Sequence, residues 1–444
     1  QTLRAALAWS YDLLTLAEQH VFARLAVMTG DCDLEAAEAV CREPDLPAGS
    51  VLDLLTRLVD KSLLLAEAGV TSARYRLLEP VRQYALRLLE ADGTLEQVRE
   101  RHAAYFLALA EQAAGELRGP EQIAWLDRLE SEHDNLRAAL LWSLADGDRV
   151  LGLRLAVALG PFWGVRGRLR EGRDWLDRLL NAPGAGELPE RLRVRALLAD
   201  GRLAQWQGDF EAADSLLTTC IELAHQLGEP LIAAEALVHL GAVYRRRGDP
   251  EGSARLLDES LHAFRAAGDE GGIALALMTL GVTLRSLGET ARSTELLEES
   301  LARFQQLGDL RWIATTQTML GSSLLKQGKL TGAARSFVAG LAAHQAIGDL
   351  TFSVFALHGL GAALARLAAL EPATQVYGVM LALCDRVGLT LDPVSQRDYD
   401  SVTAGLRAQL GAADFDRLLA EGRTLSPDQV LDGVSRVLGD LSAE

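Results

Sequence analysis

The sequence has few cysteines and few aromatic residues, with 4 cysteines and 5% aromatics in 444 residues. So few cysteines, in no close-pair pattern, do not form a disulfide framework, and a reducing cytoplasm is the compartment that we expect. No uncharged apolar run reaches the length of a membrane span. The first residues have neither the basic flank nor the cleavage site of a signal peptide. Because the chain opens on Gln1 inside an amphipathic pattern, we expect a fragment of a longer polypeptide.

Positive charge is also scarce. The chain has 44 Lys and Arg against 61 Asp and Glu, a formal net charge of -17 and a sequence pI near 5.0. This balance disfavours direct binding to nucleic acids and to anionic membranes. Ala and Leu dominate the apolar residues and β-branched residues are sparse, a composition that predicts a mainly α fold.

Glycine recurs with a fixed period in the second half of the chain. Gly228 and Gly268 begin a series whose members lie 40 residues apart, and two further series keep the same spacing. The three series are Gly228, Gly268, Gly308, Gly348 and Gly388; Gly201, Gly241, Gly281, Gly321 and Gly361; and Gly208, Gly248, Gly288 and Gly328, with Ala368 in the last place. Three independent markers with one period predict an array of structural repeats.

Each repeat has the pattern of two helices joined by a tight turn. Apolar residues at helical spacing lead to Gly248-Asp249-Pro250 and resume after it. Asp249 and its counterpart Glu289 are predicted to cap the second helix of their repeats. The stretch L-G-x-x-Y from Leu240 to Tyr244, with the small residue Ser253 after the turn, resembles the tetratricopeptide repeat. That family's usual unit is 34 residues, and the resemblance implies an α-α superhelical solenoid with a concave groove lined by first helices.

The beginning of the chain follows a different pattern. Thr15, Asp33 and Ser50 are predicted N-caps of three helices. Residues 63–67 and 74–78 then have the pattern of two strands in a hairpin, and one more helix follows. This layout predicts a winged helix-turn-helix domain. Its expected recognition helix has no net charge, and residues 1–93 hold 9 Lys and Arg against 14 Asp and Glu, which argues against DNA contact.

Four regions are therefore expected along the chain. They are a winged-helix domain at 1–92, a helical linker at 93–147, tetratricopeptide-like repeats at 148–388 and a helical C-terminal cap at 389–444. The last region is interpreted as a cap because its sequence breaks the 40-residue repeat period.

Nearly the whole chain resembles the C-terminal half of bacterial STAND-type regulators, which are signal-transduction ATPases with an NB-ARC-like core. The segments LRAALAWSYDLLTLAEQHVFARLAVM, LVDKSLL, YRLLEPVRQYALRLL and LESEHDNLRAALLWSL carry the resemblance. It implies an upstream NTPase module against which the winged helix packs, and a role in transcriptional regulation. In receptor relatives a Met-His-Asp motif after the wing reports on bound nucleotide. Here Leu77, Leu78 and Glu79 stand at those positions, so the histidine is absent.

We expect no enzyme in this chain, and neither a cofactor nor a metal ion. Gly321 and Gly328 are separated by six residues where a Walker A loop has four, and Leu330 replaces the hydroxyl residue of that loop. No G-x-S-x-G, H-E-x-x-H or C-x-x-C motif occurs. Cys32 and Cys41 are spaced too loosely for a typical metal site, and packing of both thiols in the core is the better hypothesis.

One constellation predicts a binding surface. Tetratricopeptide relatives commonly contact ligands through first-helix positions beside the Leu-Gly pair, and those positions are rich in cations here. Such a row suits carboxylates or an acidic peptide. The alternative is that long cations only solvate the C-terminal ends of first helices, where the helix dipole favours them. The residues are Arg202, Gln205, Trp206, Arg245, Arg246, Met278, Arg285, Thr318, Lys326, His358 and Arg366.

The leading hypothesis is a non-enzymatic sensor and scaffold. Its repeats would bind a protein, peptide or small effector, and its winged helix would relay binding to the NTPase module. Two alternatives stay open. One is a free-standing tetratricopeptide adaptor for protein partners, and the other is a DNA-binding transcriptional regulator that acts through the winged helix.

Overall fold

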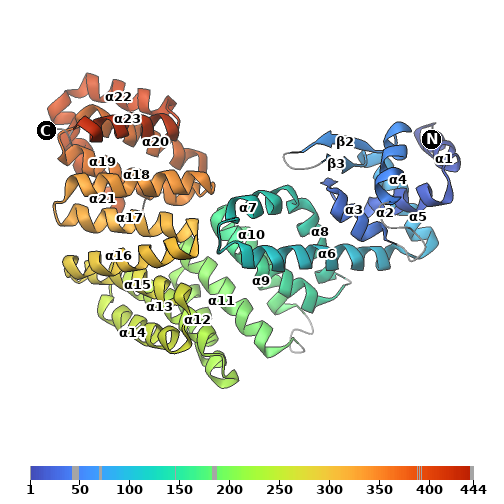
Figure 1. Ribbon diagram of the computed structural model, residues 1–444, viewed down its shortest axis with the longest axis horizontal. Coiled ribbons are helices and arrows are strands. Elements are labelled where there is room, and N and C mark those ends of the chain that lie inside the picture. Colours follow the sequence, from blue (N-terminus) through green and yellow to red (C-terminus); the bar gives the residue numbers. More distant parts are fainter. Residues whose placement is uncertain are drawn as a thin grey trace. The chain divides into compact units, whose positions relative to one another are not determined.

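The computed structural model describes residues 2–42, 50–69, 73–145, 147–182, 188–387 and 393–440, together with Leu389 and Leu391. Helices make up almost all of the described chain, which confirms the predicted mainly α fold (Figure 1). The chain forms two compact units. Unit 1 contains Gln1–Ala114, Trp125–Leu159 and Asp174–Leu192, and unit 2 contains Gly115–Ala124, Gly160–Arg173 and Arg193–Glu444. None of the described helices is long and apolar enough to cross a membrane.

Unit 1 begins with the winged helix. Thr15 caps its helix through a capping box with Glu18, and Asp33 accepts a hydrogen bond from Ala36 N at 2.8 Å, so both predicted caps are confirmed. The elements are α1 (Thr2–Asp12), α2 (Leu16–Arg24), the 3-10 helix η1 (Leu25–Val27), β1 (Asp31–Cys32), α3 (Leu34–Cys41), α4 (Ser50–Asp60), β2 (Leu65–Ala68), β3 (Ala73–Arg76) and α5 (Glu79–Asp92).

The wing differs from the predicted hairpin. A third strand, β1, completes an antiparallel sheet in the order β1-β3-β2. Two residues are too few to produce the alternation that identifies a strand, so β1 was not predicted. Helix α4 starts at Ser50 itself and ends four residues before the predicted recognition helix does. It stops there because Ser62 has a left-handed backbone (φ 57). Residues 70–72, within the predicted turn, lie outside the described residues.

Three linker helices follow the winged helix. They are α6 (Leu95–Glu116), α7 (Gln122–Ser131) and α8 (His133–Ala145). The longest, α6, buries Val98, Phe106 and Ala110 completely. These positions share one face because they are separated by eight and four residues. A charged or polar side chain at any of the three would therefore enter the core of unit 1.

The repeats are helix pairs, as predicted. They comprise α9 (Arg149–Val165), α10 (Leu169–Asn181), α11 (Glu190–Gln207), α12 (Phe210–Leu227), α13 (Pro230–Arg246), α14 (Pro250–Ala267), α15 (Glu270–Ser286), α16 (Thr290–Leu307), α17 (Leu310–Lys326), α18 (Leu330–Ala346), α19 (Leu350–Arg366) and α20 (Leu370–Val387). From α12 to α20 each helix packs against the next (Figure 1), and the first helices α13, α15, α17 and α19 also contact one another in sequence. The first helices therefore form one continuous face of unit 2.

The glycine series have distinct structural roles. Gly268 (φ 69) ends α14 and Gly288 (φ 87) follows α15, both with left-handed backbones that favour glycine. Ala368 takes the same conformation (φ 61) in the last copy. Gly241 belongs to the second series and allows close packing, because a Cβ there would lie 3.0 Å from Leu257. Gly388 lies outside the described residues.

Of the two residues predicted to cap second helices, one does so and the other does not. Asp249 Oδ1 accepts a hydrogen bond from Gly252 N at 2.8 Å, which confirms this cap. The prediction for Glu289 is wrong, because its side chain makes no hydrogen bond to the start of α16 and instead pairs with Arg292 at 3.5 Å. The longer glutamate side chain is a poorer N-cap than aspartate.

Three helices follow the repeats. They are α21 (Pro393–Leu410), α22 (Ala412–Thr424) and α23 (Pro427–Asp440). Helix α22 packs on α20, and α23 packs on α18 and α20. Phe415, Val434 and Leu438 share one apolar cluster with Phe337 and Tyr377 of the repeats. These helices therefore cover apolar surface that the final repeat would otherwise expose to water.

Candidate functional site

The face formed by the first helices curves inward. Trp206 at the end of α11 lies next to Arg311 at the start of α17, with the guanidinium carbon 4.3 Å from the ring centroid. Helices α13 and α15 stand between α11 and α17 in the row, so this contact requires the row to bend back on itself. The row of first helices is therefore curved, with Trp206 and Arg311 on its inner side.

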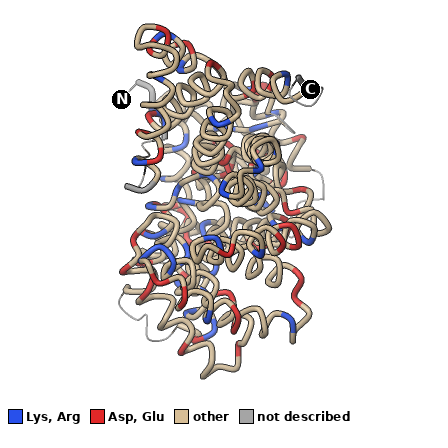
Figure 2. Tube along the Cα trace, turned by 90° about the vertical axis from the view of Figure 1, so that its left-hand side faces the viewer, with Lys and Arg blue, Asp and Glu red and all other residues tan. Residues whose placement is uncertain are grey.

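The predicted site residues differ in exposure along this face. Met278 and Thr318 are buried, Arg202, Gln205, Trp206, Arg245, Arg285 and His358 are half-buried, and Arg246, Lys326 and Arg366 are exposed. Figure 2 shows that Lys and Arg are interspersed with Asp and Glu along the trace. The distribution of charge alone therefore does not mark a binding surface. The contacts of each predicted site residue show which of them are free to bind a ligand.

Three of the cations join neighbouring repeats. Arg285 Nη1 donates to the Met319 carbonyl of the next first helix at 3.0 Å. Lys326 Nζ donates to the Arg285 carbonyl at 3.0 Å, and Arg366 Nη1 donates to the Leu325 carbonyl at 2.7 Å. The last two carbonyls belong to the final turn of a helix, where carbonyl groups lack helical partners and carry partial negative charge. Lys326 and Arg366 therefore stabilise the ends of the preceding first helices.

A cluster of like charge lies at the ends of α13 and α15. Burial, followed by the charges of Arg246 and Arg285, lowers the pKa of Arg245 to about 9. Burial and the charge of Arg246 lower the pKa of Arg285 to about 10. Arg245 Nε is buried without a hydrogen-bond partner. An anionic group placed here would offset the repulsion and supply an acceptor for Nε.

A second polar cluster surrounds Trp206. Arg202 lies over the same ring as Arg311, at 5.2 Å, and is 3.4 Å from Glu235. Burial alone would raise the pKa of Glu235, but Arg118, Arg202 and the nearby histidine lower it below its usual value. Burial lowers the pKa of Arg202 to about 10, and its Nε has no hydrogen-bond partner. This cluster thus holds an ion pair and a spare buried donor.

Two of the cluster's members were outside the sequence prediction. Glu235 and Arg311 do not flank a Leu-Gly pair, so the motif-based search missed both. In the sequence, both could have been recognised as charged residues on an apolar helix face. The buried positions that surround Arg311 in α17 show this face. His239 was missed for the same reason. Burial lowers its pKa to about 3, so the ring is neutral, and its Nε2 has no partner.

The turn before α19 adds further buried polar groups. His344 Nδ1 lies 3.8 Å from Asp349 Oδ2, and the two side chains are 0% and 1% exposed. Neither ring nitrogen of His344 nor Asp349 Oδ2 has a hydrogen-bond partner. Burial raises the pKa of Asp349 to about 6, although Arg311 opposes this change. Burial also lowers the pKa of His344 to about 3.

Linker residues belong to the same unit as this curved face. Gln122 Oε1 accepts a hydrogen bond from the backbone N of Arg311 at 2.9 Å, and its Nε2 donates to Asp309 Oδ1 at 3.3 Å. Arg118 Nη2 lies 3.9 Å from Glu235. Gly115–Ala124 therefore packs with the repeats and is joined to them through Arg311, Asp309 and Glu235.

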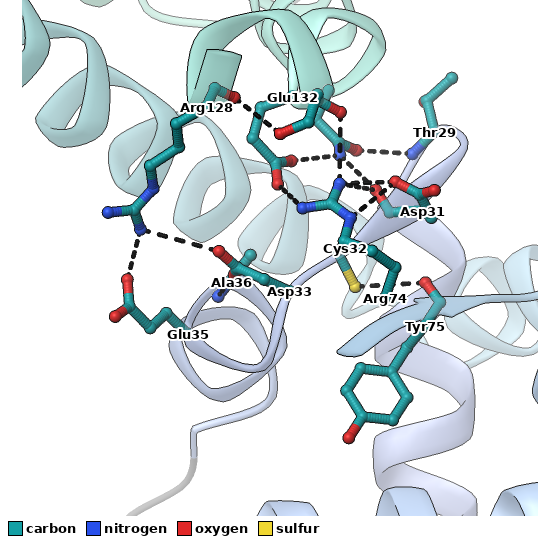
Figure 3. Close-up of polar contacts among 12 residues, drawn as sticks. Thr29, Asp31, Cys32, Asp33, Glu35, Ala36, Arg74, Tyr75, Arg128 and Glu132 are labelled. Atoms are coloured by element: carbon teal, nitrogen blue, oxygen red, sulfur yellow. Dashed lines mark hydrogen bonds and ion pairs between the residues drawn. The ribbon is translucent and has the colours of Figure 1, made fainter. Parts of the chain in front are cut away.

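In unit 1 a polar network connects the wing to α8 (Figure 3). Arg74 of β3 is its centre and pairs with Glu132, which is 1% exposed, and with Asp31 Oδ1 at 2.5 Å. Asn135 Nδ2 donates to the Asp31 carbonyl at 2.8 Å, and Asn135 Oδ1 accepts from Thr29 N at 2.8 Å. The network therefore orients the winged helix on the linker helices.

At the positions aligned with the Met-His-Asp motif, the acidic residue Glu79 forms a local ion pair. Glu79 accepts hydrogen bonds from Arg82 Nε at 2.8 Å and from Gln83 at 2.8 Å. The bond from Arg82, then that from Gln83, lowers the pKa of Glu79 to about 2. Leu78 is 49% exposed. The acidic residue is thus already engaged within α5.

The predicted recognition helix offers little free positive charge. Lys61, just after α4, pairs with the buried Glu18 at 2.7 Å. The remaining cation, Arg57, is exposed on the same helix as Asp53 and Asp60. Phosphate contacts need several cations, because each neutralised phosphate contributes separately to affinity.

The other sequence motifs have packing roles. Gly321 lies where a Cβ would come within 3.0 Å of Phe337. Cys32 Sγ faces the Tyr75 carbonyl at 3.7 Å and Cys41 Sγ faces the Val21 carbonyl at 3.8 Å, and both thiols are buried. Among the described residues, His, Cys, Asp and Glu form no group that could hold a metal ion.

Two segments of the chain match known domain families. Residues 14–90 match a winged helix-turn-helix domain and residues 232–306 match a tetratricopeptide repeat, which are both non-catalytic kinds of domain. A Mycobacterium bovis protein, provisionally named an HTH-type transcriptional regulator, is 40% identical over 247 residues, or 54% of this chain and 28% of that protein. A second M. bovis protein, uncharacterized, is 40% identical over 103 residues, or 23% of this chain and 26% of its own length. The chain thus spans less than a third of these relatives.

A solved structure has a similar fold. The Rap protein complexed with competence and sporulation factor is 15% identical, with a TM-score of 0.50 over 76% of this chain and 99% of that chain. A signal-transduction ATPase (STAND) protein with a tetratricopeptide repeat sensor from Pyrococcus horikoshii is 15% identical, with a TM-score of 0.36 over 93% of this chain and 66% of that chain. At these identities the likeness to the Rap protein shows the fold alone.

Proposed function

We propose that this chain, a winged helix-turn-helix domain joined to tetratricopeptide repeats, is the sensor and scaffold half of a STAND-type regulator. Its repeats bind a protein, peptide or small effector on the curved face of the first helices. The observation that carries the proposal is the cluster of Arg245, Arg246 and Arg285 at the ends of α13 and α15. Arg245 and Arg285 are half-buried, neighbouring positive charge lowers the pKa of both, and the Nε of Arg245 has no hydrogen-bond partner. A folded protein tolerates such repulsion most easily where an anion joins the cluster.

The chemistry of the face selects an acidic ligand. Arg245 Nε and Arg202 Nε are buried donors without partners, and guanidinium groups bind carboxylates with directional hydrogen bonds. Trp206, which lies between Arg202 and Arg245 in the sequence, adds an aromatic surface. These guanidinium donors lead us to propose a short acidic peptide as the ligand of this face.

The proposed relay runs through the linker. Arg311 touches Trp206 on one side and Gln122 of the linker segment on the other. A ligand that displaces Trp206 therefore changes the hydrogen bonds of Gln122. In the proposed full-length protein this change reaches an upstream NTPase module through the winged helix, in the cytoplasm, and the output is transcriptional regulation.

A pool of fluorescent peptides rich in Asp and Glu tests the ligand class. We expect binding to the full chain, and we expect Arg245→Gln to weaken it by at least about tenfold, as for a lost charge-assisted hydrogen bond. Arg247→Gln is the matched control, because Arg247 lies two residues away, is 53% exposed and pairs with Asp214. Equal losses in both variants, or equal binding of a Lys-rich pool, would rule out the proposed site.

Charge reversal is a poor test of this face. Arg285→Glu would remove the bond to the Met319 carbonyl and bury a carboxylate beside it. Loss of binding in such a variant would therefore report on folding. Neutral glutamine avoids this problem, and circular dichroism of each variant verifies the fold.

The upstream module is tested on the native protein. Its intact mass and N-terminal sequence should show a longer polypeptide with a G-x-x-x-x-G-K-[ST] loop before the winged helix. A native start close to Gln1 would instead favour the free-standing adaptor.

DNA binding is the second candidate, supported by the family match at 14–90 and by the name of the M. bovis relative. It predicts a band shift that strengthens as salt falls and that is lost in Arg57→Ala. The ion pair of Lys61 with Glu18 argues against it. A shift that Arg57→Ala leaves unchanged would exclude α4 as the contact.

A further inference from the structure

Unit 1 contains a cavity between the winged helix and the linker helices. Its volume is about 290 Å³, close to the lower end of the roughly 300–1,000 Å³ of small-molecule sites. Its walls come from the segment after η1, from α5, from α6 and from α8, and every lining residue belongs to unit 1. None of them belongs to the curved face of the repeats, so the cavity is independent of the peptide site proposed above.

His102 supplies a hydrogen-bond acceptor at this cavity. The side chain is 4% exposed, and its Nε2 has no hydrogen-bond partner. The other ring nitrogen faces Asn135, whose amide nitrogen already donates to the Asp31 carbonyl at 2.8 Å and to Glu132 at 2.9 Å. Asn135 therefore presents its amide oxygen to His102, so His102 Nδ1 donates a hydrogen bond to that oxygen. The neutral ring then has its lone pair on Nε2, which needs a donor.

Two arginines supply positive charge at the same cavity. Arg82 is held by Glu79 at 2.8 Å and donates from Nη1 to the Ala26 carbonyl at 3.3 Å. Arg99 makes one hydrogen bond to the described residues, from Nη1 to Glu96 at 2.8 Å. Nε and Nη2 of Arg99 are thus available for a carboxylate, which guanidinium groups bind in a bidentate manner.

The remaining walls are apolar. Val27 and Leu86 come from the winged helix, and Leu141 and Trp142 come from α8. Leu141 is 56% exposed. Trp142 is fixed by the hydrogen bond from its Nε1 to Glu96 at 2.9 Å. An apolar ligand body would cover Leu141 and contact the indole ring.

We propose that this cavity binds a small amphipathic carboxylate that also has a hydroxyl group. The carboxylate pairs with Arg99, the hydroxyl donates to His102 Nε2, and the apolar body packs between Leu86 and Leu141. Because the ligand contacts winged helix and linker at once, binding strengthens their mutual packing. The site is therefore a second, small-molecule input to the winged helix.

The probe is 4-hydroxyphenylacetate, whose binding to the full chain is measured by calorimetry. We expect a dissociation constant at or below about 1 mM, consistent with the modest affinity per atom of small ligands. Phenylacetate, which lacks the hydroxyl, and 4-hydroxyphenylacetamide, which lacks the charge, should each bind at least about tenfold more weakly. Equal affinity of all three compounds would overturn the proposal, as would no binding by the probe or by related hydroxylated carboxylates at 10 mM, roughly ten times the expected constant.

Three variants locate the binding site. Arg99→Gln should weaken binding by at least about tenfold, like the loss of one charge-assisted contact. Ala138→Leu should abolish binding, because residue 138 lines the cavity and the larger side chain occupies it. Arg101→Gln is the control on the same helix, since Arg101 donates to the Arg42 carbonyl at 2.8 Å and does not line the cavity. Unchanged binding in the first two variants, with the fold verified by circular dichroism, would place the probe elsewhere.

Discussion

Replacing Arg74 by methionine should destabilise unit 1 far more than the same change two residues later on the same strand. Arg74 pairs with Glu132, whose side chain is 1% exposed, and with Asp31. Removal of one partner of a buried pair leaves an uncompensated charge and typically costs about 3–5 kcal/mol. Arg76 pairs with Glu67, and these side chains are 45% and 63% exposed. Arg76→Met should therefore cost at most about 1 kcal/mol.

The cost of Arg74→Met should also depend on pH. Burial raises the pKa of Glu132 above its usual value, and both the hydrogen bond and the charge of Arg74 hold that increase down. Without Arg74 the pKa rises further. When folding raises the pKa of a carboxyl group, the free energy of unfolding falls as pH rises through the pKa of that group in the folded protein. The loss of stability in Arg74→Met should therefore be large at pH 8 and smaller at pH 5.

Urea unfolding of both variants, followed by circular dichroism at the two pH values, measures these differences. Arg74→Met combined with Glu132→Gln should recover part of the loss at pH 8, because the second change removes the unpaired charge. The reasoning would be refuted by equal losses in Arg74→Met and Arg76→Met, or by a deficit at pH 5 as large as that at pH 8.

Three further predictions concern unit 2 and can be measured by the same urea titrations. Asp349→Asn keeps the cap on Phe352 N and removes a carboxyl group whose pKa burial raises to about 6. The variant should match the natural chain near pH 4 and be more stable by about 1–3 kcal/mol above pH 7, and a gain that is independent of pH would contradict this origin. Gly272→Ala should destabilise by about 1–3 kcal/mol because its Cβ would lie 2.1 Å from the Phe264 ring, whereas Gly405→Ala, with no atom within 4 Å, should stabilise by up to about 1 kcal/mol. Ala368→Gly should stabilise by about 0.5–1 kcal/mol, since Ala368 has φ 61; a loss of stability would show that backbone strain is not significant there.

The repeats were predictable because their signals are local. A left-handed helix end needs glycine, so Gly268 and Gly288 mark helix boundaries whatever surrounds them. The caps at Thr15 and Asp33 are local for the same reason, since each side chain bonds to a backbone N three residues later. Strand β1 lacked such a signal, because it pairs with β3, more than 40 residues away.

The binding faces depended on contacts that no local pattern reports. Arg311 and Glu235 lie outside the motif positions, and the curvature of the first-helix row brings Arg311 to Trp206. The search of the sequence chose Lys326 and Arg366 by their position beside the repeat motif, and the structure places both on helix-end carbonyls. Charge and spacing place a cation on a helix, but its partner depends on the neighbouring helix.

The sequence by itself determined the helical class, the repeat period, the helix ends and the winged-helix layout, because glycine conformation, capping and apolar spacing act over a few residues. Tertiary structure decided which polar groups were buried together. It placed Arg245 beside two like charges, left Nε2 of His102 without a donor, and set Arg74 against Glu132. Desolvation and long-range contact produce these features, and both arise only when distant segments pack.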